Sequence, residues 1–174
     1  MKHGIEMFAL GINQRMINVG LGEMSVTRDT TVVLSCIGLG SCIAVCVYDP
    51  FTKSGGLAHM LLPLGRKDND ISSPSVKYID TGVPLFINQV IKQSSGRENL
   101  IVKVIGGATM LQVPGGGLLD IGQRNIQEIK AALAKEKIPI LGWDVGGTAG
   151  RSVHFFLDTG RIMIKALNGP LTEM

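Results

Sequence analysis

The chain has 174 residues, of which 45% are hydrophobic and 18% are charged. This length predicts one domain over residues 1–174, since a typical domain holds roughly 150 residues. The apolar share excludes a largely disordered chain. The formal net charge of +3 comes from scattered lysines and arginines, and aromatic residues make up only 5%. We therefore predict no nucleic-acid-binding surface, which would need a basic stripe or a stacking platform.

Membrane insertion and a disulfide framework are also not expected. No apolar run approaches the roughly 20 residues that a membrane helix needs. Residues 1–11 hold too short an apolar run for a signal peptide. The three cysteines, Cys36, Cys42 and Cys46, are odd in number and closely spaced. The sequence therefore predicts a reduced, cytoplasmic protein.

The first half of the chain is predicted to form strands. Short apolar and β-branched runs, separated by glycine, proline or polar residues, are typical of buried strands. In chain order they cover residues 17–27 (interrupted at Gly20–Gly22), 31–36, 43–48 and 57–62. Glycines at 38–40 break the chain sharply, and residues 52–56 predict a hairpin turn.

The second half mixes helices with strands. Apolar residues at helical spacing predict a helix over residues 74–94, with Ser73 as N-cap and with Pro84 causing a kink or a late start. A second helix is predicted over residues 120–137. Strands are expected at 100–105, 138–145, 152–157 and 161–166, and loops at 65–73 and 115–117. The result is an α+β domain in which strands dominate and two helices pack on the sheet.

The segment Gly38-Leu39-Gly40-Ser41-Cys42 is the strongest candidate for chemistry. A cysteine after a tight glycine turn can serve as a nucleophile, because glycines allow close approach and leave N–H groups free for an oxyanion. The alternative is a buried structural cysteine at a strand start.

His59 is the only polar side chain between Leu57 and Pro63. It can be a core residue, or the base that accepts a thiol proton and so lowers the pKa of the thiol. The predicted hairpin would bring it near Cys42. His3 and His154 are interpreted as solvated or structural.

Other constellations are weaker. The three cysteines with His59 lack the paired spacing of a zinc site, so no metal is predicted. The glycine clusters fit neither a P-loop nor a dinucleotide site, and turns are the better interpretation. Asp144 and Arg151 are expected to form a structural ion pair.

Several short motifs follow one another along nearly the whole chain. They comprise residues 38–42, 49–50, 56–63, 77–78, 103–110, 121–125, 144–151 and 159–160. In this order they resemble the CheD family, the chemoreceptor glutamine deamidases of bacterial and archaeal chemotaxis.

The resemblance implies a cysteine hydrolase with an α/β sandwich fold, similar to the catalytic domain of the cytotoxic necrotizing factor toxins. It implies that glutamines on cytoplasmic chemoreceptor helices become glutamates, with Cys42 as nucleophile, His59 as base and no cofactor. It also implies binding to CheC, a phosphatase of the phosphorylated response regulator CheY.

One position departs from the family pattern. Cys36 stands where the family usually carries a threonine as the third catalytic residue, and a thiol is a poor acceptor. The carbonyl of residue 36 could orient His59 instead. Ser35 could also substitute, although neighbouring strand side chains point to opposite faces. Two alternatives therefore stay open: a binding module that regulates a CheC-type phosphatase with little catalysis, and a cysteine amidase or esterase that acts on another substrate.

Overall fold

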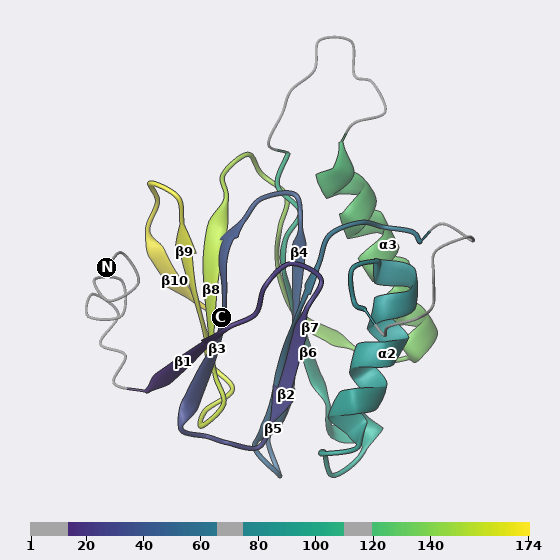
Figure 1. Cartoon of the computed structure of the whole chain (residues 1–174), viewed down its shortest axis with the longest axis vertical. Helices are drawn as coiled ribbons and strands as arrows, with labels where there is room; N and C mark the ends of the chain where they lie inside the picture. Colours follow the sequence, from purple (N-terminus) through teal and green to yellow (C-terminus); the bar gives the residue numbers. More distant parts are fainter. Residues whose placement is uncertain (1–13, 66–74, 110–119) are drawn as a thin grey trace.

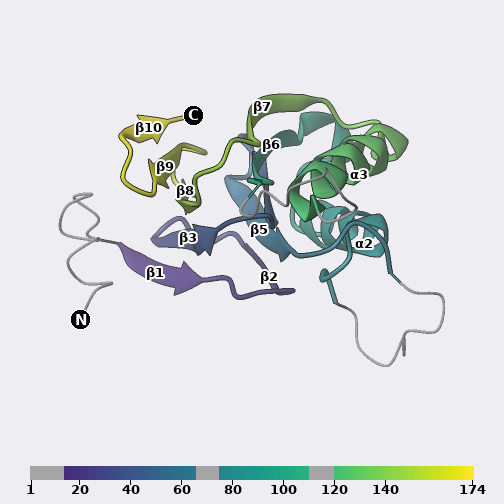
Figure 2. The same cartoon turned by 90° about the horizontal axis from the view of Figure 1, so that it is seen from above.

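The computed structural model describes residues 14–65, 75–109 and 120–174, which form three layers (Figure 1). Two five-stranded sheets face each other, and two helices cover the outer face of one of them. Seen from above, the sheet without helices stands apart from the helical layer (Figure 2). The predicted strand-rich α+β sandwich with two main helices is therefore confirmed.

The first sheet has the order β1-β3-β8-β9-β10 and the second the order β2-β5-β4-β6-β7. Helix α2 and helix α3 pack on the second sheet, and η1 is a short 3-10 helix. The elements are β1 (Arg15–Asn18), β2 (Met24–Thr27), β3 (Val32–Leu39), β4 (Ile43–Asp49), β5 (Ser54–Met60), α2 (Ile79–Ile91), η1 (Arg97–Asn99), β6 (Ile101–Gly106), α3 (Ile121–Glu136), β7 (Ile140–Val145), β8 (Arg151–Phe156), β9 (Ile162–Ala166) and β10 (Leu171–Glu173).

Strand β4 contributes to two apolar cores, because successive side chains of a strand point to opposite faces. Ile43, Val45 and Val47 pack toward the helices. Ala44 and Cys46 pack between the sheets. All seven residues of β4 are buried, which explains why it reads as a continuous apolar run.

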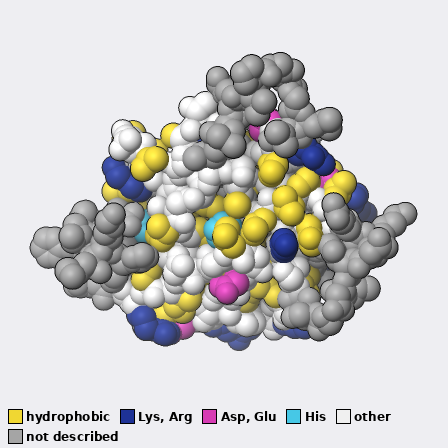
Figure 3. Space-filling view, turned by 45° about the horizontal axis from the view of Figure 1, so that its top comes forward, with side chains coloured by type: hydrophobic (Ala, Val, Ile, Leu, Met, Phe, Trp, Pro, Cys, Tyr) yellow, Lys and Arg dark blue, Asp and Glu magenta, His cyan; other side chains and the backbone are white. Residues whose placement is uncertain are grey.

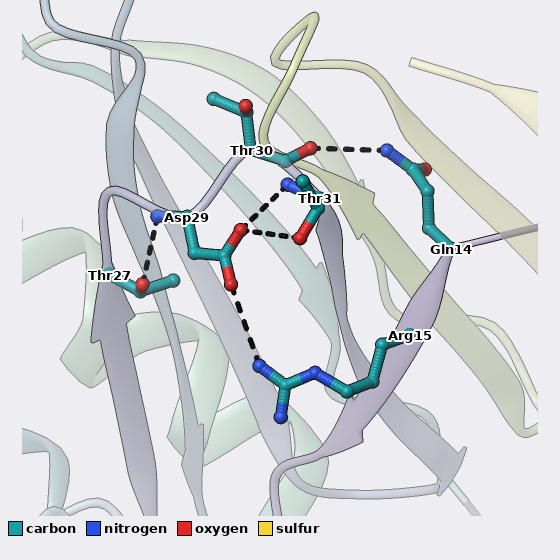
Figure 4. A network of polar contacts seen from close by, with 6 residues as sticks. All are labelled: Gln14, Arg15, Thr27, Asp29, Thr30 and Thr31. Atoms are coloured by element: carbon teal, nitrogen blue, oxygen red, sulfur yellow. Dashed lines mark hydrogen bonds and ion pairs between the residues drawn. The ribbon is translucent and has the colours of Figure 1, made fainter.

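The chain crosses between the sheets three times before β5. Residues 19–23 lead from β1 to β2, residues 28–31 from β2 to β3, and residues 40–42 from β3 to β4. The second crossover is held by Asp29, whose carboxylate accepts hydrogen bonds from Thr31 N (2.9 Å) and Oγ1 (2.6 Å) and pairs with Arg15 (Figure 4).

Two predicted boundaries differ from the structure, and one strand has no counterpart among the predicted elements. The strand expected over residues 17–27 is two strands in different sheets, because the chain turns at Gly22, whose φ is +74°. Helix α2 begins at Ile79 rather than at residue 74, since Leu61 N and Leu62 N both bind Lys77 O and hold that residue beside the end of β5. Strand β10 was not predicted.

The remaining predicted elements agree to within a few residues. The hairpin joins β4 to β5, and α3 begins after Asp120, which caps Gln123 N. The predicted loop segments 66–73 and 115–117 and the N-cap Ser73 lie outside the described residues. Within the described ranges, no helix combines the length and apolar character that crossing a membrane requires.

Candidate functional site

The hairpin brings the two predicted residues to one end of the space between the sheets. Cys42 lies at the end of the β3–β4 crossover and packs against the core between the sheets. His59 lies in β5, where its register partner is Ala44, two residues after Cys42. Residues two apart share a strand face, so thiol, Ala44 and imidazole lie on the side that faces the first sheet.

The crossover that carries Cys42 is held through three consecutive carbonyl oxygens. Gly40 O accepts a hydrogen bond from Ala108 N (2.9 Å), and Cys42 O accepts one from Gly107 N (2.8 Å). Between them, Ser41 O accepts from Asn125 Nδ2 of α3 (2.9 Å). The backbone around Cys42 is therefore fixed from the segment that follows β6 and from α3.

Gly106 lets these two segments approach each other. Its φ is +118°, and a Cβ at this position would lie 2.2 Å from Cys42 O. Any other residue would therefore be strained and would push the crossover away. The glycine pair after β6, which sequence analysis interpreted as a turn, thus supports the segment that carries the thiol.

The imidazole of His59 is oriented by a main-chain carbonyl. Nδ1 lies 3.2 Å from Val19 O in the β1–β2 crossover. Because a carbonyl can only accept, Nδ1 carries the proton and Nε2 is left with a lone pair. Nε2 is buried and has no hydrogen-bond partner in the described part of the chain. The ring therefore presents a free basic nitrogen.

The thiol of Cys36 contacts the same carbonyl, in line with the expectation that a thiol is a poor acceptor for the imidazole. Its Sγ lies 3.6 Å from Val19 O. The carbonyl of residue 36 does not orient His59, because the imidazole binds the carbonyl of Val19 instead. Ser35 does not orient it either, because its hydroxyl donates to Ile17 O (3.4 Å). The Val19 segment is in turn fixed by its N–H, which donates to Ser35 O (2.7 Å).

Burial shifts both candidate groups toward their neutral forms. Desolvation raises the pKa of Cys42, although its own main-chain N–H counteracts this. Desolvation lowers the pKa of His59, opposed by the Val19 carbonyl and the charge of Glu23. The expected lowering of the thiol pKa is therefore not found. The structure instead favours an uncharged thiol and an uncharged imidazole on the same side of the sheet, and the proton must move when a substrate is attacked.

The outer surface of this end is apolar around a histidine. With the top of Figure 1 turned forward, hydrophobic side chains gather about histidine atoms near the middle of the face, with basic and acidic side chains close by (Figure 3). Leu21 is 64% exposed and neighbours Gly22, whose N–H binds His59 O (2.9 Å). An exposed apolar face of this kind is typical of a site that binds a protein rather than a small polar molecule.

Other predicted residues lie elsewhere or have structural roles. Cys46 and His154 are buried, and His3 lies outside the described residues. The Asp144–Arg151 ion pair is confirmed, and Arg151 also donates to Gly146 O. Its glycine loop is tied to β6, because Gly146 N donates to Gly106 O (2.8 Å).

Two residues that shape the site were not predicted from the sequence as site residues. Val19 acts through its carbonyl, which leaves no mark in the side chain. Asn125 is fully buried and was predicted only as part of a family motif. A signal was present for Asn125, since this polar residue directly precedes Ile126 on the apolar face of the second predicted helix.

The fold and these residues define a two-sheet α+β protein with a cysteine and a histidine at one end of the space between its sheets. The family model described as CheD chemotactic sensory transduction matches residues 61–166. The chain is 38% identical over 156 residues to a Symbiobacterium thermophilum protein, covering 89% of this chain and 94% of the relative. The chain belongs to the CheD family.

Further relatives support the assignment. Identity is 35% to a protein of Caldanaerobacter subterraneus subsp. tengcongensis (90% and 96% covered) and 38% to one of Pyrococcus abyssi (91% and 97% covered). All three relatives are named probable chemoreceptor glutamine deamidase CheD. A solved Neisseria meningitidis protein of family DUF152 is similar at 12% identity and a TM-score of 0.42, covering 83% of this chain and 66% of that one.

Proposed function

We propose that this protein is a cytoplasmic chemoreceptor glutamine deamidase that uses Cys42 as nucleophile and His59 as base. Family membership supports the substrate class, because the relatives are named for this activity. The observation that carries the chemistry is His59, whose Nδ1–H is bound to Val19 O while Nε2 stays unpartnered. This imidazole is poised to accept one proton from a group on its own side of the sheet.

The proposed first step forms a thioester. His59 Nε2 takes the Cys42 proton as Sγ attacks the carbonyl carbon of the glutamine side chain. The tetrahedral intermediate collapses, the C–N bond breaks, and the imidazolium gives its proton to the nitrogen, which leaves as ammonia. Water, deprotonated by the neutral imidazole, then attacks the thioester and releases glutamate and the Cys42 thiol.

In this account the apolar surroundings favour a concerted proton transfer over a resting ion pair. Burial disfavours thiolate and imidazolium alike, so charge develops only as the bond to substrate forms. The negative oxygen of the intermediate needs hydrogen-bond donors within the site. The main-chain N–H of Cys42 is a suitable donor, because it already stabilises negative charge on its own sulfur.

We assign Cys36 a supporting role rather than a place beside the imidazole. Its thiol donates to Val19 O and so helps to hold the carbonyl that orients His59. A threonine hydroxyl, the usual residue of the family, could donate to the same oxygen. The departure at position 36 is then compatible with an active site.

Two further proposals concern the domain organisation and a second partner. We infer that residues 1–174 form one domain, because the three crossovers before β5 and the core between the sheets join both sheets closely. We propose a CheC-type phosphatase as a second partner on the family resemblance alone. A purely regulatory module would bind that phosphatase without converting glutamine.

The test is incubation with a chemoreceptor cytoplasmic fragment while ammonia release is followed. A deamidase releases ammonia in proportion to the glutamine converted. A fragment whose acidic sites carry methyl esters separates the esterase alternative, which would release methanol instead. Release of neither product by reduced, folded protein would contradict the proposed activity and favour the regulatory module.

A further inference from the structure

Asn125 connects the two segments that carry the proposed catalytic pair. Its side-chain Nδ2 lies 2.9 Å from Ser41 O, directly before Cys42, and 2.9 Å from Leu61 O, two residues after His59. Both partners are carbonyl oxygens, so the group between them must be the NH₂ group, which has one N–H for each. The carboxamide therefore spans from the β3–β4 crossover to the end of β5.

The bond to Ser41 fixes the direction of the next N–H. In a trans peptide the C=O and N–H point in opposite directions, so holding Ser41 O toward α3 turns the Cys42 N–H away from α3. That is the side on which the Cys42 thiol packs, against the core between the sheets. The same N–H lowers the pKa of the thiol. Rotation of this one peptide would remove the donor from the site.

The two carbonyls on either side of Ser41 show why Asn125 matters more than the two residues after β6 that also hold the crossover. Gly40 O and Cys42 O are held by main-chain N–H groups of Ala108 and Gly107, whatever the side chains there. Ser41 O alone of the three is held by a side chain. The orientation of the Ser41–Cys42 peptide therefore depends on residue 125.

Burying the Asn125 side chain destabilises the folded protein, and packing alone does not explain why a polar residue stands here. The side chain is fully buried, and its Oδ1 has no hydrogen-bond partner in the described ranges. A buried polar atom without a partner is destabilising. An apolar residue would fill the same place on α3 without that cost, so the carboxamide is better explained by what its NH₂ group holds.

We infer that Asn125 is a positioning residue that aims the Cys42 N–H at the oxyanion and keeps the Cys42 and His59 segments in register. The inference rests on the proposed function for the oxyanion itself. The geometry around Asn125 does not depend on the proposed function, and this geometry determines how the Cys42 thiol reacts even without receptor.

The test compares the full-length protein with Asn125→Asp and Asn125→Leu. Both replacements keep the size of the side chain and remove the NH₂ group. Ile129→Ala is the control, since Ile129 is a fully buried residue of the same helix in the apolar core toward the second sheet. The rate at which iodoacetamide alkylates Cys42 is measured against pH by peptide mass spectrometry, which separates Cys42 from Cys36 and Cys46.

The expected result is a higher pH midpoint of Cys42 alkylation in both Asn125 variants and an unchanged midpoint in Ile129→Ala, although Ile129→Ala also melts at a lower temperature. With receptor fragment, kcat falls by about 10²–10³-fold, the loss typical of one oxyanion donor, while KM stays near the wild-type value. Unchanged alkylation and kcat in folded Asn125 variants would overturn the inference while leaving the deamidase intact.

A second measurement needs no variant. In the wild-type protein, the side-chain NH₂ protons of Asn125 are expected to exchange with solvent far more slowly than those of exposed Gln127. Equal exchange rates would show that the two hydrogen bonds are not kept in solution and would overturn the inference. If wild-type protein shows slow exchange and the alkylation difference but converts no glutamine, the proposed function fails and the positioning role of Asn125 stands.

Discussion

The carbonyl oxygen of Val19 lies 3.2 Å from Nδ1 of His59, so the imidazole is oriented by the backbone of the β1–β2 crossover. A carbonyl does this whatever the side chain at residue 19. The tautomer that it selects leaves Nε2 basic. Orientation of the imidazole therefore does not require a hydroxyl at position 36.

Replacement of Cys36 tests this division of roles. In Cys36→Ala the Val19 carbonyl loses one of its two side-chain donors and keeps His59, so kcat is expected to fall by about tenfold at most, the effect of one neutral hydrogen bond. Cys36→Thr is expected to match or exceed the wild-type rate. Cys46→Ala, a buried cysteine of the same core, controls for lost packing. Loss of all activity in Cys36→Ala would mean that Cys36 acts directly on the reaction.

The pH profile of kcat/KM reports the protonation of His59. The proposed base must be neutral, so activity is present above its pKa and lost as the pH falls through it. Burial lowers that pKa, which places the acid limb below the ordinary value of about 6.5. Steady-state rates from pH 5 to 9 on receptor fragment check this. An acid limb at or above the ordinary value would contradict the role of burial.

Glu23 provides a second pH test. Its negative charge raises the pKa of His59, so Glu23→Gln is expected to lower that pKa further and to move the acid limb to lower pH. Glu98→Gln, an exposed carboxylate in η1 before the start of β6, is the matched control and should not move it. A shift in the opposite direction, or the same shift in both variants, would refute the electrostatic explanation.

Gly106→Ala is expected to damage both fold and site. A Cβ at Gly106 would lie 2.2 Å from Cys42 O, whereas one at Gly38, which also has a positive φ, would meet nothing within 4 Å. Gly38→Ala should therefore cost only backbone strain, about 1–2 kcal/mol, and keep its activity. Gly106→Ala should cost about 4 kcal/mol and lose most activity. Urea unfolding and kcat check this pair, and equal effects would argue against the predicted clash.

Arg151 is expected to stabilise the protein without touching the reaction. It is nearly buried and donates to Asp144 O (2.7 Å), to the Asp144 carboxylate and to Gly146 O. Arg151→Ala should cost about 2–4 kcal/mol of unfolding free energy, less than a fully buried pair because Asp144 is partly exposed. Arg15→Ala, which breaks an exposed pair, should change it by less than about 1 kcal/mol. Similar losses in both variants would contradict this account.

Local sequence patterns predicted most strands because the core strands are short runs of apolar residues. They did not predict the division of the strands into two sheets. Residues 17–27 show this best, since their apolar pattern is nearly continuous while β1 pairs with β3 and β2 pairs with β5. Which partner a strand takes is decided by distant segments, and a local pattern holds no record of them.

The site was predictable where side chains carry the chemistry and hidden where the backbone does. Cys42 and His59 follow from a glycine turn and from a lone polar residue in a strand. The Val19 carbonyl left no signal in the sequence. The predicted lowering of the thiol pKa was wrong, because that prediction considered the nearby imidazole and not the burial of both groups. Burial depends on packing of the two sheets, which the local sequence does not describe.

The most direct test of the account is peptide-resolved mass spectrometry of a chemoreceptor cytoplasmic fragment incubated with wild-type protein, Cys42→Ala or Cys46→Ala. Wild-type protein and Cys46→Ala are expected to convert discrete glutamines to glutamates, and Cys42→Ala is expected to convert none. Conversion that persists in Cys42→Ala, or its absence with folded and reduced wild-type protein, would contradict the claim that Cys42 is the nucleophile of a receptor deamidase.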